Sequence, residues 1–159
     1  MLQIEYSKTA VKFINKMDRP TKQRIKAAIE GLTEQPPKGD IKTLQGYTDG
    51  RKRLRVGKYR IIYNFLPNGE IEILYIIDID MSQRKENESM STATKQAIDL
   101  MELLPEKDQN FALEFIKKLV IAWDPDYTKV TPAERAELER AQKEIENGET
   151  ISHDAINWD

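Results

Sequence analysis

Hydrophobic residues in the first part of the chain recur at helical spacing. Between residues 6 and 34 they return at steps of three and four, as at Phe13, Ile14 and Met17, which places them on one face of a helix. The polar segment around Pro20 interrupts this pattern, and proline is favoured in the first turn of a helix. The pattern therefore predicts two antiparallel helices in this region.

The spacing of hydrophobic residues changes to two over residues 42–80, as expected for β-strands. Residues 59–65 are rich in β-branched and aromatic side chains, and residues 71–79 form a nearly continuous apolar strand expected at the sheet centre. The Pro-Asn-Gly sequence between them is a hairpin signal, and residues 2–6 are expected to form an edge strand. The predicted fold class is α+β, with a helical hairpin on a three- or four-stranded, mainly antiparallel sheet.

The pattern after residue 85 is polar at first and then helical. Residues 86–92 are interpreted as a linker, and residues 93–123 predict a helical hairpin that is interrupted by a proline. Thr131 and Glu134 have the spacing of a capping box at the start of a polar helix, which a short extended tail follows. This helix has only a thin apolar stripe, so it is expected to lie along another surface.

The charge of the chain is divided unevenly between its two parts. Residues 1–89 hold 17 basic and 12 acidic residues, a net charge of +5, whereas residues 90–159 hold 8 basic and 15 acidic residues, a net charge of −7. Such asymmetry indicates a nucleic-acid partner for the basic part or neutralisation of one part by the other. Two differently charged solvent-exposed surfaces remain the alternative.

The composition of the 159 residues excludes several classes of protein. The chain has no cysteine, which excludes disulfides, thiolate zinc sites and a cysteine nucleophile and suits a reducing compartment. No segment has the roughly 18 consecutive apolar residues that a membrane span needs, and the first residues lack the apolar run of a signal peptide. A cytoplasmic protein without a membrane partner is expected.

Conventional catalytic motifs are absent from the basic part. Its sequence has no histidine, since the single histidine of the chain is His153, and it has neither a glycine-rich phosphate loop nor an acidic cluster with metal-site spacing. We therefore expect no metal and no cofactor.

The most unusual feature of the basic part is the density of cations in residues 51–60. Six of these ten residues are basic: Arg51, Lys52, Arg53, Arg55, Lys58 and Arg60. Arg51, Arg53 and Arg55 alternate along a predicted strand and should share one face, where guanidinium groups can bind phosphates. The alternative is an edge strand that its charges protect from aggregation.

Residues 2–85 resemble the RelE/ParE toxin superfamily. The resemblance is carried by the helical hairpin, by the sequence KTLQG at residues 42–46 and by the block LRVGKYRIIY at residues 54–63. It implies a toxin of a type II toxin–antitoxin pair. Relatives that resemble RelE cleave mRNA in the ribosomal A site without a metal: the ribose 2′-OH attacks the adjacent phosphate, and basic side chains stabilise the developing charge.

The resemblance also implies which residues carry this activity. Arg51, Arg53, Arg60 and Arg84 are the candidate catalytic residues, and Arg60 is the expected phosphate clamp. Lys52, Arg55 and Lys58 are the candidate substrate-binding residues. Glu88 stands where RelE-like nucleases have a tyrosine, which leaves open a ParE-like poison of DNA gyrase or a non-catalytic, permanently inhibited binding module.

Residues 90–159 resemble the RelB-like antitoxins that are encoded beside such toxins. The most specific part is the helix followed by GETISHD at residues 148–154. The resemblance implies that the antitoxin binds the toxin in cis or in a domain-swapped dimer, and that only the free toxin meets ribosome and mRNA. The residues expected to make inhibitory contacts are Leu138, Ile145, Ile151, Ile156 and Trp158.

These arguments predict a toxin at residues 1–85, a linker at residues 86–92 and an antitoxin at residues 93–159. Within the antitoxin, the hairpin at residues 93–123 is expected to dimerise, and residues 131–159 are expected to wrap around the toxin. No ribbon–helix–helix strand or helix-turn-helix is evident, so DNA binding stays open.

Overall fold

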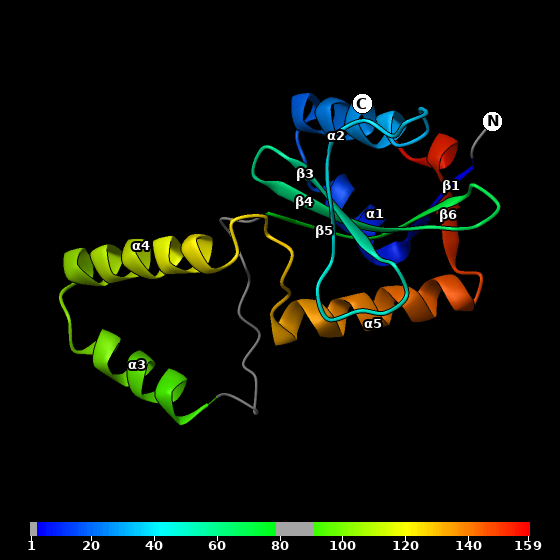
Figure 1. The fold of residues 1–159 in the computed structure, drawn as a ribbon. Helices are drawn as coiled ribbons and strands as arrows, with labels where there is room; N and C mark the ends of the chain where they lie inside the picture. The colour runs from blue at the N-terminus through cyan, green and yellow to red at the C-terminus, as the bar shows by residue number, and fades with distance from the viewer. Residues whose placement is uncertain (1–2, 79–90) are drawn as a thin grey trace. The chain divides into compact units, whose positions relative to one another are not determined.

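The computed structural model describes residues 3–78 and 91–159 (Figure 1). These residues belong to two compact units. The first unit combines Met1–Gln83 with Thr128–Asp159, and the second unit is Arg84–Tyr127. The C-terminal segment is therefore part of the same compact unit as the N-terminal part of the chain.

The first unit is built around a six-stranded sheet with the strand order β2-β3-β4-β5-β1-β6. Neighbouring strands run antiparallel except for β1 and β5, which are parallel. The strands are β1 (Ile4–Ser7), β2 (Asp40–Thr43), β3 (Lys52–Val56), β4 (Tyr59–Phe65), β5 (Ile71–Asp78) and β6 (Thr150–Ser152).

The sheet differs from the sequence-based prediction in its size and in the position of its first strand. We predicted three or four strands with the first at an edge, whereas β1 lies between β5 and β6. The reason is that the C-terminal strand β6 pairs with β1, with Tyr6 opposite Ile151 and Ser7 opposite Thr150. This pairing covers an edge that would otherwise present unpaired backbone groups.

Two helices pack with one face of this sheet. Helix α1 (Lys8–Asn15) is capped by Ser7, whose hydroxyl accepts from the backbone N–H of Ala10, and helix α2 (Arg19–Gly31) is capped by Asp18. The predicted apolar stripes of both helices enter the main hydrophobic core. That core includes Ala10, Ile14, Ile25, Ile29, Leu54, Ile61, Tyr63, Ile73 and Ile76.

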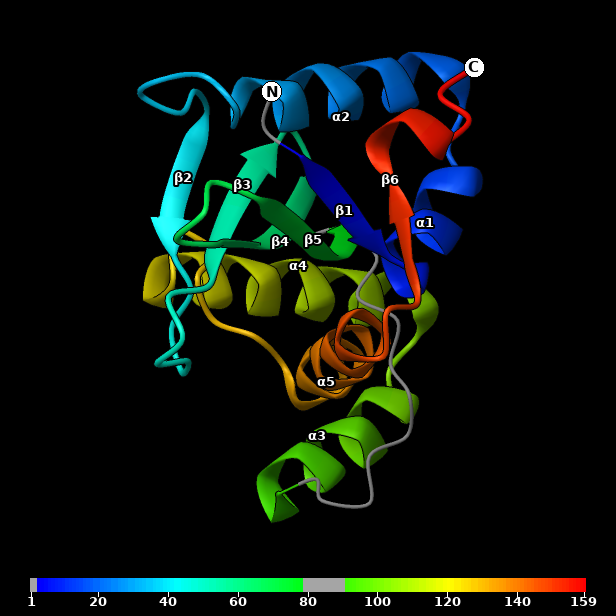
Figure 2. The same ribbon diagram turned by 90° about the vertical axis from the view of Figure 1, so that its right-hand side faces the viewer.

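Helix α5 (Pro132–Glu146) covers the opposite face, so that α2 and α5 lie on different sides of the sheet in Figure 2. A second, smaller core of Leu44, Ile62, Leu74, Leu138 and Ala141 joins α5 to the sheet. Thr131 caps α5 and accepts from the backbone N–H of Glu134, as the sequence pattern predicted. The described residues thus form a mixed α+β fold, which confirms the predicted class.

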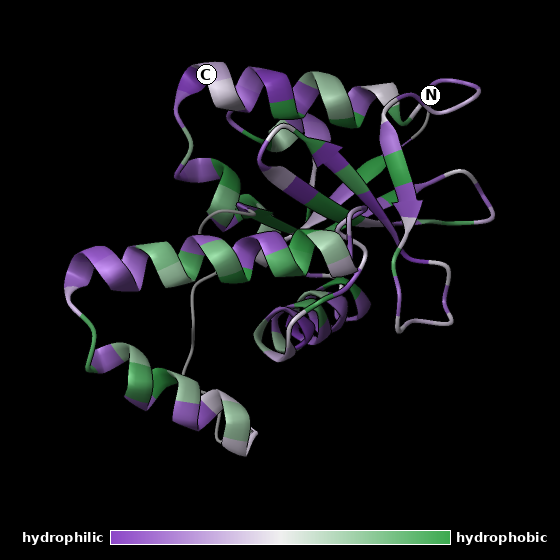
Figure 3. Cartoon of the chain, turned by 60° about the vertical axis from the view of Figure 1, so that its left-hand side comes forward, coloured by the Kyte–Doolittle hydropathy of each residue, from purple (hydrophilic) through white to green (hydrophobic). Residues whose placement is uncertain are grey.

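The second unit contains the helices α3 (Thr92–Glu102) and α4 (Glu106–Trp123). Neither helix has a buried residue. Hydrophobic and hydrophilic residues are interspersed along both helices in Figure 3. Most of the predicted linker, residues 86–92, lies outside the described residues. Among the described helices, none combines the length and the apolar character of a membrane span.

Candidate nucleic-acid interface

The arginines of residues 51–60 lie on one face of the sheet. Arg53 pairs with Ile62 across β3 and β4, and Arg55 pairs with Arg60. Residues directly opposite each other in an antiparallel pair project to the same face, and Ile62 belongs to the core beneath α5. We call Arg51, Arg53, Arg55 and Arg60 the arginine face. It lies on the face that α5 covers, and Arg51, Arg53 and Arg60 are only 6%, 1% and 5% exposed.

Arg60 makes the closest charged contact between the sheet and α5. Its Nη2 donates to Oε2 of Glu134, and its Nη1 donates to the backbone carbonyl of Lys129 at 2.7 Å. Glu134 is held by the helix cap, since its Oε1 accepts from the hydroxyl of Thr131 at 3.3 Å. Burial raises the pKa of Glu134, and the neighbouring guanidinium of Arg60 opposes that rise. The pair is a nearly fully buried ion pair at the N-terminus of α5.

Arg51 occupies a second position beneath α5. Its Nε donates to Oδ2 of Asp49 at 2.7 Å, and its Nη2 donates to the amide oxygen of Gln142 at 3.4 Å. Its guanidinium carbon lies 4.4 Å from the ring centroid of Tyr47. Arg51 Nη1 is buried and has no hydrogen-bond partner among the described residues.

The other predicted cations have different surroundings. Arg53 Nη1 donates to the backbone carbonyl and to Oδ1 of Asp40 at 2.6 and 3.0 Å, which ties β3 to β2. Arg55 is half-buried, and its Nε donates to the carbonyl of Gly57. Lys58 forms an ion pair with Asp78 at 3.2 Å. Lys52 is half-buried, whereas Arg84 and Glu88 lie outside the described residues.

The five residues expected to make inhibitory contacts all pack against the first part of the chain. Leu138 is fully buried in the smaller core, and Ile145 packs against that core. Ile156 and Trp158 are buried in the main core, and Ile151 packs against it.

Sequence reasoning missed a polar cluster around the C-terminal tail. His153 Nδ1 lies 2.7 Å from the hydroxyl of Tyr6, and its Nε2 lies 3.0 Å from Oε1 of Glu30. The indole N–H of Trp158 donates to the carbonyl of His153 at 3.1 Å. Burial raises the pKa of Tyr6. No local pattern marks this cluster, because its members come from widely separated parts of the chain.

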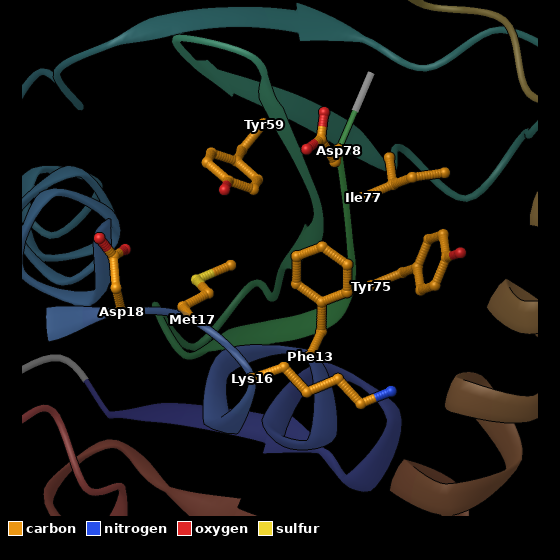
Figure 4. Close-up of a pocket in the computed structure, with 8 residues that line it drawn as sticks. All are labelled: Phe13, Lys16, Met17, Asp18, Tyr59, Tyr75, Ile77 and Asp78. Atoms are coloured by element: carbon orange, nitrogen blue, oxygen red, sulfur yellow. The ribbon is translucent and has the colours of Figure 1, made fainter. Parts of the chain in front are cut away.

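A cavity of about 340 Å³ lies between α1 and the ends of β4 and β5 (Figure 4). It is lined by Phe13, Lys16, Met17, Asp18, Tyr59, Tyr75, Ile77 and Asp78. Burial raises the pKa of Tyr75 to about 12, with Glu134 and Glu137 adding to the rise and Arg60 opposing it. Tyr75 thus lies between this cavity and the buried ion pair.

The described residues contain no group of three or more histidine, aspartate or glutamate side chains placed to hold a metal ion. The chemistry that the arginine face offers is electrostatic: guanidinium groups held in place by neighbouring side chains and suited to phosphate oxygens.

The comparison with known protein families identifies a class of toxins. A family model described as the ParE toxin of the type II toxin–antitoxin system, parDE, matches residues 4–85, just over half of the chain. The chain belongs to this family, within the RelE/ParE toxin superfamily, and the family implies an antitoxin as partner. A search of curated proteins found no match.

Proposed function

We propose that this chain carries a toxin and its own antitoxin. The toxin, residues 1–85, is a metal-independent endoribonuclease that cleaves mRNA on the ribosome. The antitoxin, residues 93–159, follows a linker at residues 86–92 and inhibits the toxin in cis or within a domain-swapped dimer. The observation that carries the proposal is the ion pair between Glu134 and Arg60, with which α5 covers the arginine face.

The chemistry assigned to the arginine face is stabilisation of charge on the scissile phosphate. The 2′-OH of the ribose attacks the adjacent phosphate and gives its proton to water. The bond from phosphorus to the 5′ oxygen of the next nucleotide breaks, and that oxygen takes a proton from water, which leaves a 2′,3′-cyclic phosphate and a free 5′-OH. Arg60 binds the phosphate, while Arg51, Arg53 and Arg84 contribute positive charge around it. Arginine hardly deprotonates, so these residues act as electrostatic catalysts rather than as general bases. Lys52, Arg55 and Lys58 bind the RNA backbone.

Inhibition in this proposal is occupation of the phosphate site. The carboxylate of Glu134 has the charge and the oxygen acceptors of a phosphate, and it takes the guanidinium that the substrate needs. Leu138 and Ile145 anchor α5 in the smaller core, and Ile151, Ile156 and Trp158 anchor the tail in the main core. The charges of +5 and −7 on the two parts favour this association.

Expression of residues 1–89 alone tests the proposal. We expect this fragment to arrest translation, co-expressed residues 90–159 to relieve the arrest, and Arg60→Ala to abolish it. In a cell-free translation assay, loss of this phosphate contact should lower the cleavage rate by about 100-fold or more. Arg19→Ala, an exposed cation on α2, is the matched control and should leave the arrest unchanged. The nuclease proposal would be overturned if the fragment were harmless, or if it remained equally toxic after the substitution Arg60→Ala.

The description of the matching family favours a second candidate, a poison of DNA gyrase. In that case the fragment of residues 1–89 would inhibit supercoiling of plasmid DNA by purified gyrase and leave cell-free translation intact. Inactivity in both assays would favour a non-catalytic, permanently inhibited module.

A further inference from the structure

Three buried polar atoms beneath α5 have no hydrogen-bond partner among the described residues. They are the hydroxyl of Tyr47, Nη1 of Arg51 and Oδ1 of Asn64. Their side chains lie together: Arg51 stacks on the ring of Tyr47, and both Arg51 and Asn64 donate to Oε1 of Gln142 at 3.4 Å. Buried polar groups are nearly always hydrogen-bonded. Helix α5 covers this cluster and supplies Gln142 as an acceptor, but it leaves these three atoms without a hydrogen-bond partner. The unused donors and acceptors indicate a site for another ligand.

The ring of Tyr47 contacts a planar group that α5 supplies. The guanidinium carbon of Arg135 lies 5.0 Å from the Tyr47 ring centroid, and that of Arg51 lies 4.4 Å from it. Arginine and nucleobases both stack on aromatic faces. Departure of α5 would remove Arg135 while leaving Tyr47 and Arg51 in place, because both belong to the first part of the chain.

The hydrogen bonds of Arg51 narrow the choice of ligand. Its Nε donates to Asp49, which orients the guanidinium. Gln142 accepts from Nη2 but not from Nη1. A ligand with two adjacent acceptors would use both Nη1 and Nη2. Among the nucleobases, guanine presents such a pair in O6 and N7, and its two-point contact with arginine is the commonest specific base contact in protein–DNA complexes.

We propose that Tyr47, Arg51 and Asn64 form a binding subsite for a guanine base of single-stranded RNA, which α5 fills with Arg135 and Gln142 when docked. The base lies beside the Arg51 guanidinium and in its plane, so that both stack on the same side of Tyr47. Its O6 and N7 accept from Nη1 and Nη2 of Arg51, and Asn64 contacts its remaining edge. This subsite rests on the proposed function in so far as RNA is the substrate. It adds the preference for guanine and gives α5 the role of a substrate mimic, with Glu134 in place of the phosphate.

The test uses the full chain with α5 released by Leu138→Glu, which places a charge in the smaller core. Binding of fluorescein-labelled 2′-fluoro pentanucleotides, which lack the 2′-OH nucleophile, is measured by anisotropy. We expect UUGUU to bind at least about fivefold more tightly than UUUUU or UUAUU, in line with the energies of base contacts. Adding Tyr47→Leu should weaken the binding of UUGUU by about fivefold or more, whereas Tyr47→Phe should retain it.

The matched control is Tyr59→Leu, the same substitution on the opposite face of the sheet, which should leave RNA binding unchanged. Equal binding of the three oligonucleotides, or an unchanged affinity in Tyr47→Leu, would overturn the subsite. If circular dichroism shows that Leu138→Glu has lost its sheet, the test is repeated as hydrogen exchange on the unmodified chain. Millimolar guanosine 5′-monophosphate should speed the exchange of α5 amides in the unmodified chain but not in the Tyr47→Leu variant. Unchanged exchange in the unmodified chain would overturn the subsite.

The two proposals fail separately. Binding of UUGUU through Tyr47 without any RNA cleavage by residues 1–89 would retain the guanine subsite and remove the nuclease. Cleavage that is indifferent to Tyr47→Leu would retain the nuclease and remove the subsite.

Discussion

Arg60 and Glu134 face each other with side chains that are only 6% and 7% exposed. A buried ion pair adds little stability relative to an apolar pair of the same shape, because both charges lose their hydration. Breaking it by removing one partner is costly, because the other charge then stays buried without compensation. The pair therefore determines what binds at this position more than how stable the fold is.

A double-mutant cycle at this pair tests that view. We expect Arg60→Met to lower the free energy of unfolding by about 3–5 kcal/mol at neutral pH, and the double variant Arg60→Met/Glu134→Gln to recover most of the loss. Urea unfolding measures both effects. Arg19→Ala, which removes an exposed partner of Asp159, should change stability by less than about 1 kcal/mol. A double variant as unstable as the single one would contradict this account.

The pH dependence of the same variant has a defined sign. Burial raises the pKa of Glu134, and loss of Arg60 removes the group that opposes this rise. A raised folded-state pKa gives stability that is present at low pH and is lost as the pH rises through that pKa. The deficit of Arg60→Met should therefore shrink as the pH falls from neutral toward 4, as urea unfolding at several pH values would detect.

Buried tyrosines make the fold sensitive to alkali. Burial raises the pKa of both Tyr63 and Tyr75 from 10.0 to about 12. The stability that these neutral phenols contribute is complete below pH 10 and is lost as the pH rises toward 12. We expect absorbance at 295 nm to show part of the phenols ionising only on unfolding, and Tyr63→Phe/Tyr75→Phe to unfold at higher pH. Ionisation of all tyrosines near pH 10 without unfolding would contradict this prediction.

At the scale of elements, α5 and β6 both join the sheet that the first part of the chain forms, α5 on one face and β6 at one edge. Helix α5 covers the arginine face, and β6 extends the sheet beyond β1. Helix α5 also reaches α1, since both carboxylate oxygens of Glu144 accept from Thr9 at 2.9 Å. The free energy of α5 docking is therefore expected to control the toxin.

Leu138 is the residue through which to weaken that docking. Leu138→Ala should cost about 2–5 kcal/mol, because it leaves a cavity against Leu44, Ile62 and Leu74. In the proposed function it should also make the full chain toxic when expressed. Glu139→Ala, on the exposed side of the same helix, should change neither property. A destabilised but harmless Leu138→Ala would show that α5 docking does not control toxicity.

At the scale of the whole molecule, the described residues of the second unit form no hydrophobic core of their own. Its two helices contain no buried residue, although α4 carries Phe111, Phe115, Ile116, Leu119 and Trp123. Units of about 40 residues rarely fold alone without a metal, a disulfide or a partner. A second copy of the chain is the partner that we proposed for residues 93–123.

Light scattering of the full chain tests this dimer. We expect a dimer at micromolar concentration and a monomer in Phe115→Glu/Leu119→Glu, with the unfolding of the first unit unchanged. Lys117→Glu, a charge change at a half-buried position of the same helix, is the control and should remain dimeric. A strictly monomeric unmodified chain would exclude both the dimer and domain swapping.

The sequence by itself determined the local structure. The apolar periodicity of α1 and α2, the alternation along β3 and β4, and the cap at Thr131 depend on residues within a few positions of each other. Periodicity and capping preferences act between residues close in sequence, so they can be recognised in the sequence without the tertiary structure. The placement of the arginines on one strand face followed from the same alternation.

Only the tertiary structure decided what covers each surface. The burial of the arginine face, the internal position of β1 and the covering of Tyr47 and Arg51 by α5 all depend on residues 128–159 meeting the first part of the chain. Pairs such as Tyr6 with Ile151 and Arg60 with Glu134 are far apart along the chain, and no local periodicity encodes them. Their formation depends on long-range burial of apolar surface, which selects partners by shape and charge in three dimensions.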